Sequence, residues 1–104
     1  MRMLDFSVDK QIISRSATCD FTGLVAGTSG YLHARFYFSR EWSGFLKIAK
    51  FDGPECTKHV PLIGNSCSIP PEVLTGGSFK VSVIGKRGKD YLTTSSATVI
   101  QRRR

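Results

Sequence analysis

Cys56 and His59 are the residues whose types and spacing come closest to a catalytic pair. A thiol activated by a nearby imidazole is a common enzymatic nucleophile. On a β-strand, however, residues three positions apart point to opposite faces of the sheet, so these side chains are not expected to meet. Most carboxylates fall at turn-like positions, and the chain has no GxSxG, HExxH or glycine-rich phosphate-binding motif. The sequence therefore predicts a protein that is not an enzyme.

The three cysteines, Cys19, Cys56 and Cys67, could also bind zinc or form a disulfide. Their odd number, the lack of a CxxC pair and the lack of an export signal at the start of the chain favour reduced thiols. The two histidines, His33 and His59, are far apart in the sequence. We therefore expect no metal site and no cofactor, with the cysteines acting as small, half-buried apolar residues.

Exposed cations and aromatic residues are the remaining candidates for binding a partner. The formal net charge is +7, which suits docking on an acidic protein surface and also permits nucleic-acid binding. Strict alternation over residues 31–38 places a polar and aromatic row on one face of a strand. The candidate interface residues are Arg2, Tyr31, His33, Arg35, Tyr37, Arg102, Arg103 and Arg104. A single-strand nucleic-acid binder would use a similar row, but RNP-type and CxxC-type motifs are missing.

The three consecutive arginines at positions 102–104 follow a predicted strand directly. Guanidinium groups this close repel one another unless carboxylates or other anions lie nearby. We expect the three arginines to lie against an acidic patch of a neighbouring subunit, and the alternative is a solvated tail that only aids solubility. On this interpretation, deleting the three arginines would leave the melting temperature of the isolated domain nearly unchanged.

Trp42 is the only tryptophan in the chain, and either ligand binding or core packing would explain it. It lies between a phenylalanine-rich strand and a strand that begins at Phe45, so we expect its indole to close one end of the core against Phe38 and Phe45. Its N–H should then find a carbonyl group or water. The predicted core residues are Phe36, Phe38, Trp42, Phe45, Phe79, Val81 and Val83.

These residues must be positioned by short β-strands, because two-residue alternation recurs along nearly the whole chain. The predicted strands are 4–8, 11–14, 19–24, 31–38, 45–51, 57–62, 66–69, 79–83 and 97–101. A single helical turn is expected over residues 70–74, and glycine-containing turns separate the strands. The pattern predicts one all-β domain over residues 1–104, an antiparallel immunoglobulin-like β-sandwich of about seven to nine short strands with a basic C-terminal tail.

Three blocks of the sequence, in this order and spacing, resemble small virion proteins of tailed bacteriophages and prophages of Gram-positive hosts. The first is FSREWSG at 38–44, followed by a strand that ends in AKF at 49–51. The second is CSIPPEVL at 67–74, and the third is VSVIG at 81–85. The resemblance covers about residues 36–85 and implies an immunoglobulin-like sandwich used as a building or attachment module.

The resemblance implies a non-enzymatic virion structural or accessory protein, such as a capsid decoration, head–tail connector or tail component. Its expected partners are major capsid or tail subunits, with many copies or a homo-oligomer in the assembly. The expected location is the virion, assembled in the host cytoplasm, and neither a membrane nor nucleic acid is an expected partner. A carbohydrate- or receptor-binding sandwich, with Trp42, Tyr37 or Tyr91 in an exposed aromatic cluster, and a basic nucleic-acid-binding accessory protein are the alternatives.

Overall fold

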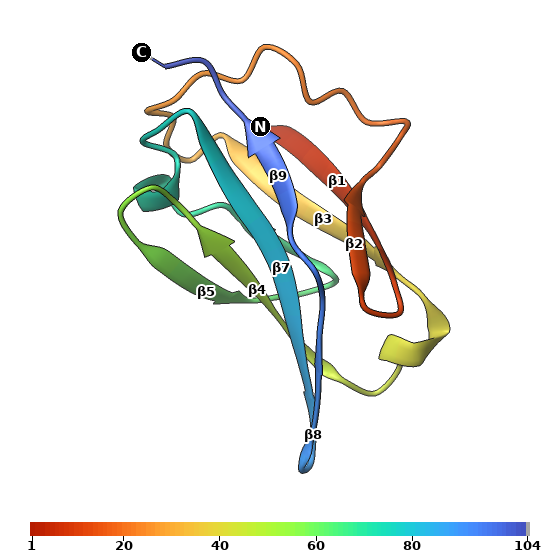
Figure 1. Ribbon diagram of the computed structural model, residues 1–104. Helices are drawn as coiled ribbons and strands as arrows, with labels where there is room; N and C mark the ends of the chain where they lie inside the picture. Colours follow the sequence, from red (N-terminus) through yellow and green to blue (C-terminus); the bar gives the residue numbers. More distant parts are fainter. Residues whose placement is uncertain (104) are drawn as a thin grey trace.

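The computed structural model describes residues 1–103 and arranges them in two packed β-sheets (Figure 1). The first sheet has the strand order β2-β1-β3-β6, and its strands are β1 (Arg2–Asp9), β2 (Ile12–Arg15), β3 (Leu32–Phe38) and β6 (Ser66–Ser68). The second has the order β5-β4-β7-β8, with β9 also paired to β7, and its strands are β4 (Leu46–Asp52), β5 (Thr57–Pro61), β7 (Ser78–Arg87), β8 (Asp90–Thr93) and β9 (Ala97–Ile100). This arrangement confirms the predicted all-β sandwich.

Alternation along the strands explains which side chains fill the space between the sheets. In β1, Leu4, Phe6 and Val8 are buried, and the residues between them are not. In β7 the same period buries Phe79, Val81 and Val83. Because each strand turns one row inward, two sheets suffice to enclose a single core.

A continuous chain of six aromatic rings runs through that core. Successive ring centroids lie 5.3–6.1 Å apart. In order, the rings belong to Phe21, Phe6, Phe36, Phe38, Trp42 and Phe45. The guanidinium carbon of Arg15 lies 5.4 Å from the Phe21 centroid, and that of Arg87 lies 4.4 Å from the Phe45 centroid. Cations therefore shield both partly exposed ends of the aromatic chain from water.

Trp42 closes one end of this core, as the sequence predicts. It belongs to the short 3₁₀ helix η1 (Arg40–Trp42) between β3 and β4, and its side chain is 0% exposed. The indole N–H donates a hydrogen bond of 2.8 Å to the carbonyl oxygen of Lys10 in the β1–β2 turn. The partly buried rings of Phe38 and Phe45 pack on either side of it.

A second 3₁₀ helix, η2 (Pro71–Val73), forms where the single helical turn was predicted. Its Val73 is buried, and the main chain of Val73 lies against Gly53 at the end of β4. A Cβ atom at Gly53 would approach the Val73 Cα to 2.6 Å, so this close packing of helix on turn requires glycine.

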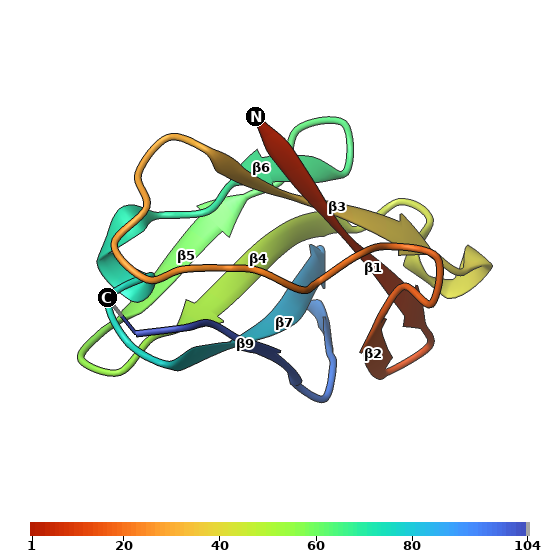
Figure 2. The ribbon, with the colours of Figure 1, turned by 90° about the horizontal axis from the view of Figure 1, so that it is seen from above.

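Residues 19–24 are not a strand, which corrects one sequence-based prediction. The segment 16–24 instead lies along the edge of β1 that the short strand β2 leaves open (Figure 2). There the Ser16 N–H donates to the Asp5 carbonyl at 2.9 Å, and the Cys19 sulfur accepts from the Asp5 N–H at 3.3 Å. Irregular contacts thus satisfy backbone groups that a regular strand would otherwise pair.

Strand pairing differs from the antiparallel prediction at one place, because β1 and β3 run parallel. The chain turns back at Lys10 into β2, and the segment 16–31 then returns it to the end of the sheet where β1 begins. Parallel neighbours need such a long connection, whereas the other strand pairs in residues 1–103 are antiparallel. The sequence analysis also does not predict strand β8 (Asp90–Thr93), which pairs with the end of β7.

Candidate functional site

The predicted outward row on β3 is present, but its cation is already paired within the chain. His33 is half-buried, whereas Arg35 and Tyr37 are exposed on the outer face of the first sheet. The Nε and Nη2 atoms of Arg35 each donate a 3.0 Å hydrogen bond to the Asp5 carboxylate on β1, and these bonds raise the pKa of Arg35. Its guanidinium also lies 5.5 Å from the ring centroid of Tyr37. Arg35 is therefore held in place and partly neutralised.

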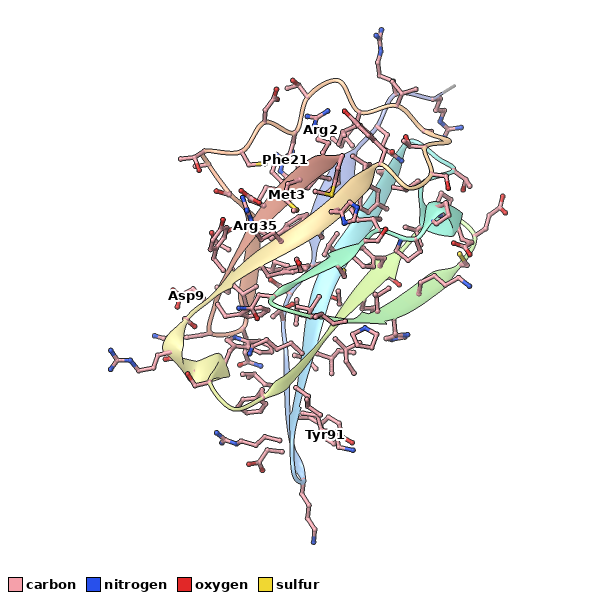
Figure 3. The ribbon with its side chains drawn as sticks, turned by 180° about the vertical axis from the view of Figure 1, so that it is seen from behind. Arg2, Met3, Asp9, Phe21, Arg35 and Tyr91 are labelled. Atoms are coloured by element: carbon pink, nitrogen blue, oxygen red, sulfur yellow. The ribbon has the colours of Figure 1, made fainter. Side chains whose placement is uncertain are left out.

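Arg2 is engaged with its own chain rather than projecting freely. Its Nη2 donates 2.8 Å hydrogen bonds to the carbonyl oxygens of Asp20 and Thr22 in the segment 16–31 (Figure 3). The Asp20 carboxylate in turn accepts bonds from the Thr22 hydroxyl and N–H, and these bonds lower the pKa of Asp20. Tyr31 lies exposed just before β3, and its carbonyl accepts the Arg2 N–H at 2.8 Å. Arg2 therefore fastens the segment 16–31 to the first sheet.

Arg102 and Arg103 contact their own domain, whereas the sequence predicts that deleting residues 102–104 leaves the stability of the isolated domain nearly unchanged. The main chain of Arg102 pairs with the segment 24–26, donating to the Leu24 carbonyl and accepting from the Ala26 N–H, both at 2.8 Å. The side chain of Arg103 lies over Gly77, with its Nε 3.3 Å from where a Cβ atom would be. Arg104 lies outside the described residues. At least Arg102 is thus part of the folded domain.

Truncation after Gln101 is therefore expected to destabilise the isolated domain, contrary to the expectation from a free tail. Loss of the two Arg102 backbone hydrogen bonds should cost about 1–3 kcal/mol. For a domain of this size, the melting temperature should fall by roughly 4–8 °C per kcal/mol, measurable by circular dichroism.

A matched control separates the contribution of the Arg102 backbone to stability from the contribution of the arginine side chains. The double variant Arg102→Ala/Arg103→Ala retains the backbone pairing and should melt within about 2 °C of the wild type, since each exposed substitution is nearly neutral. Equal melting temperatures for the truncated and full-length chains would show that the Arg102 pairing contributes nothing.

The three cysteines are free thiols and are all partly buried in the fold. Cys56 packs partly against the core, and its sulfur donates to the Glu72 carbonyl at 3.6 Å, whereas His59 is exposed on β5. Burial raises the pKa of the Cys67 thiol from 9.0 to about 12, so this thiol stays protonated and unreactive at neutral pH. Among residues 1–103, no three His, Cys, Asp or Glu side chains are grouped to hold a metal ion. Reduced, metal-free cysteines remain a prediction.

The outer face of the second sheet carries exposed apolar residues, of which the sequence analysis names only Tyr91 as a candidate. Leu46 on β4 and Tyr91 on β8 are 73% and 67% exposed, and both flank Lys86 of β7 in the strand register. The next row places Ile48 directly between Pro61 and Ile84. We call these residues the hairpin face: Leu46, Ile48, Pro61, Ile84, Lys86 and Tyr91.

The apolar residues of the segment 45–51 indicate a strand but do not tell which of its faces is exposed. Residues 45–51 contain apolar side chains at both odd and even positions, so alternation alone did not tell which row points outward. In the structure, Ala49 and Phe51 are buried, and Leu46 and Ile48 lie on the opposite face.

A shallow depression of about 530 Å³ lies at the opposite end of the second sheet. Its lining includes two carboxylates, Asp52 and Glu55, and two cations, Lys80 and Arg103. The Asp52 carboxylate is engaged, because it accepts a 2.6 Å hydrogen bond from the Thr57 hydroxyl. Because charges of both signs line this depression, it favours neither an anion nor a cation.

Comparison with models of known protein families finds no match, and comparison with curated proteins finds none either. Among residues 1–103, the structure has no helix long and apolar enough to cross a membrane. What is established for this chain is a two-sheet β-sandwich with two largely exposed apolar side chains, Leu46 and Tyr91, beside Lys86 on the outer face of the second sheet.

Proposed function

We propose that the chain is a non-enzymatic structural or accessory protein of a tailed-bacteriophage virion, which acts by docking on other virion proteins. The observation that carries the proposal is the resemblance of three ordered sequence blocks over residues 36–85 to small virion proteins. A capsid decoration, a head–tail component and a tail component all fit this proposal, with capsid or tail subunits as partners and many copies in each particle.

The positions of the resembling residues in the fold support this interpretation. The first block forms η1 and buries Trp42, the second forms β6 and η2 and buries Ile69 and Val73, and the third lies in β7. Buried apolar residues of this kind hold a scaffold together and do not form a reactive site. A scaffold module of this kind works through its exposed surfaces, where repeated weak contacts add up in a symmetric assembly.

The two alternative functions have less support. A carbohydrate site needs exposed aromatic rings close together, but Trp42 is fully buried, and Tyr37 and Tyr91 lie on the outer faces of different sheets. A nucleic-acid site on β3 would need a free cation, but Arg35 is paired with Asp5.

The proposal is tested by purifying phage particles from cells that carry the gene and quantifying the chain by mass spectrometry. We expect a fixed copy number per particle that survives a wash in about 0.5 M salt, at which long-range charge attraction is largely screened. An unrelated basic protein of similar size, added as a control, should wash off. Absence of the chain from washed particles would refute the proposed function.

A further inference from the structure

The hairpin face breaks the rule that governs the outer surface of a sandwich. Outward rows of an antiparallel sheet are normally polar, because only the inward row is covered. Here Ile48 and Ile84, both half-buried, lie side by side on the outward face of the two central strands of the second sheet, and Leu46 and Tyr91 flank Lys86 in the next row toward the hairpin. A contiguous apolar patch on the middle of a sheet is typical of an interaction site, whereas scattered apolar residues are not.

The shape of the molecule makes this patch accessible. The β7–β8 hairpin extends beyond the rest of the sandwich (Figure 1). Tyr91 belongs to this hairpin, and its side chain lies near the projecting end (Figure 3). Lys86 lies between Leu46 and Tyr91 in the register, and its ammonium is 5.8 Å from the Tyr91 ring centroid. Apolar and cationic groups therefore alternate across a surface that a partner can approach directly.

The charges around the patch indicate the chemistry of its partner. Lys86 lies within the patch and Lys89 lies in the turn of the hairpin, whereas Arg87 points to the opposite face, where its guanidinium carbon is 4.4 Å from the Phe45 ring centroid and its Nη2 pairs with Asp90 at 3.8 Å. A second copy of this chain would bring like charges together at such a surface. Nucleic acid would use stacking aromatic rings, but the patch is mainly aliphatic, with Tyr91 as its single ring. An acidic protein surface with apolar side chains complements both features.

We propose that the hairpin face is the docking surface of this protein and binds an acidic, partly apolar surface of a different protein subunit. The inference rests on the proposed function for the identity of that subunit as a virion protein, but the chemistry of recognition follows from the face itself. Leu46 and Tyr91 supply the apolar contact, and Lys86 between them pairs with a carboxylate of the partner.

The test removes the apolar contact and leaves the fold intact. The variant Leu46→Thr/Tyr91→Thr replaces two side chains that are largely exposed with a residue that suits β-strands. The matched control Ile12→Thr removes an aliphatic side chain, 67% exposed, from β2 of the first sheet. Both variants should melt close to the wild type, and their melting curves are measured first.

Binding to purified phage particles is then compared at equal concentrations of the full-length chains. We expect the hairpin-face variant to lose at least about tenfold in occupancy and the first-sheet control to bind as the wild type does. The variant Lys86→Gln should bind more weakly and with less dependence on salt, whereas Lys58→Gln on β5 should have no effect. Wild-type binding together with undiminished binding of the hairpin-face variant would overturn this inference and leave the proposed function standing.

A second arm works without particles and so separates the two proposals. A soluble peptide of glutamate and leucine is titrated into the ¹⁵N-labelled full-length chain, with a lysine and leucine peptide of the same pattern as control. We expect amide shifts at Leu46, Lys86 and Tyr91 with the acidic peptide alone, weakened at least about tenfold in the hairpin-face variant. No shifts, shifts spread over both sheets, stronger shifts with single-stranded DNA, or self-association in sedimentation would each overturn the inference.

Discussion

Replacing Trp42 with alanine should lower the free energy of unfolding by about 3–5 kcal/mol, the usual cost of truncating a large buried aromatic side chain. The indole is 0% exposed and contacts the rings of Phe38 and Phe45, with centroid separations of 5.3 Å and 6.1 Å. Its loss also leaves the Lys10 carbonyl without the 2.8 Å hydrogen bond that it accepts from the indole N–H. Denaturant unfolding followed by circular dichroism measures the change.

Two controls separate the contributions at Trp42. The variant Trp42→Phe keeps an aromatic ring but loses the N–H, so its cost should be clearly smaller than that of the alanine variant. Tyr37→Ala removes an aromatic ring that is 52% exposed and should cost less than about 1 kcal/mol. Native tryptophan fluorescence should show the blue-shifted emission of a dry indole. A red-shifted emission, or an alanine variant as stable as Tyr37→Ala, would contradict the structural role.

Adding a single methyl group beside Trp42 should also be costly. A Cβ atom at Gly85 of β7 would lie 2.7 Å from the Trp42 Cζ3 and 3.1 Å from the Phe45 Cδ2. Both rings are packed against the core and have little room to move, so Gly85→Ala should cost about 1–3 kcal/mol through overpacking. Alanine in a strand would otherwise be slightly stabilising relative to glycine, which makes the sign of the effect diagnostic.

The Gly85 prediction has a matched control in Gly77. The three atoms nearest to a Cβ atom there all belong to the Arg103 side chain, the closest being its Nε at 3.3 Å, and a flexible side chain can move aside. Gly77→Ala should therefore be nearly neutral. In the Trp42→Phe background, where the ring is smaller, the cost of Gly85→Ala should fall, and this coupling is measured as a double-mutant cycle. A neutral Gly85→Ala would show that the Trp42 ring is not tightly held.

Strands with clean alternation were predictable almost to the residue. The segment 31–38 became β3 (Leu32–Phe38) with Leu32, Ala34 and Phe36 buried, because its apolar residues occupy one row only. The burial of Trp42 was predictable for a similar reason, since phenylalanines flank it on both predicted strands. Residues 19–24 resemble a strand by composition, but their path follows the edge of β1, where the Ser16 N–H donates to the Asp5 carbonyl and the Cys19 sulfur accepts from the Asp5 N–H.

The candidate site was only partly predictable. The row of His33, Arg35 and Tyr37 does face outward, but the bidentate pairing of Arg35 with Asp5 depends on the parallel register of β1 and β3. No local pattern specifies a partner so distant in the sequence. The engagement of Arg2 by Asp20 and Thr22, and of the Arg102 backbone by Leu24 and Ala26, likewise depends on where the segment 16–31 runs.

The sequence by itself determined the positions of most strands, the all-β class and the aromatic composition of the core. These properties follow from side-chain alternation and turn residues, which act over a few positions. Only the tertiary structure decided that β1 and β3 run parallel, that Arg102 is part of the fold, and that Leu46 and Ile48 face outward. Alternation defines two faces of a strand but does not tell which face is buried. In β7, Val81 and Val83 face the other sheet, and the register of β4 on β7 places Ala49 and Phe51 beside them, so this face of β4 is the buried one.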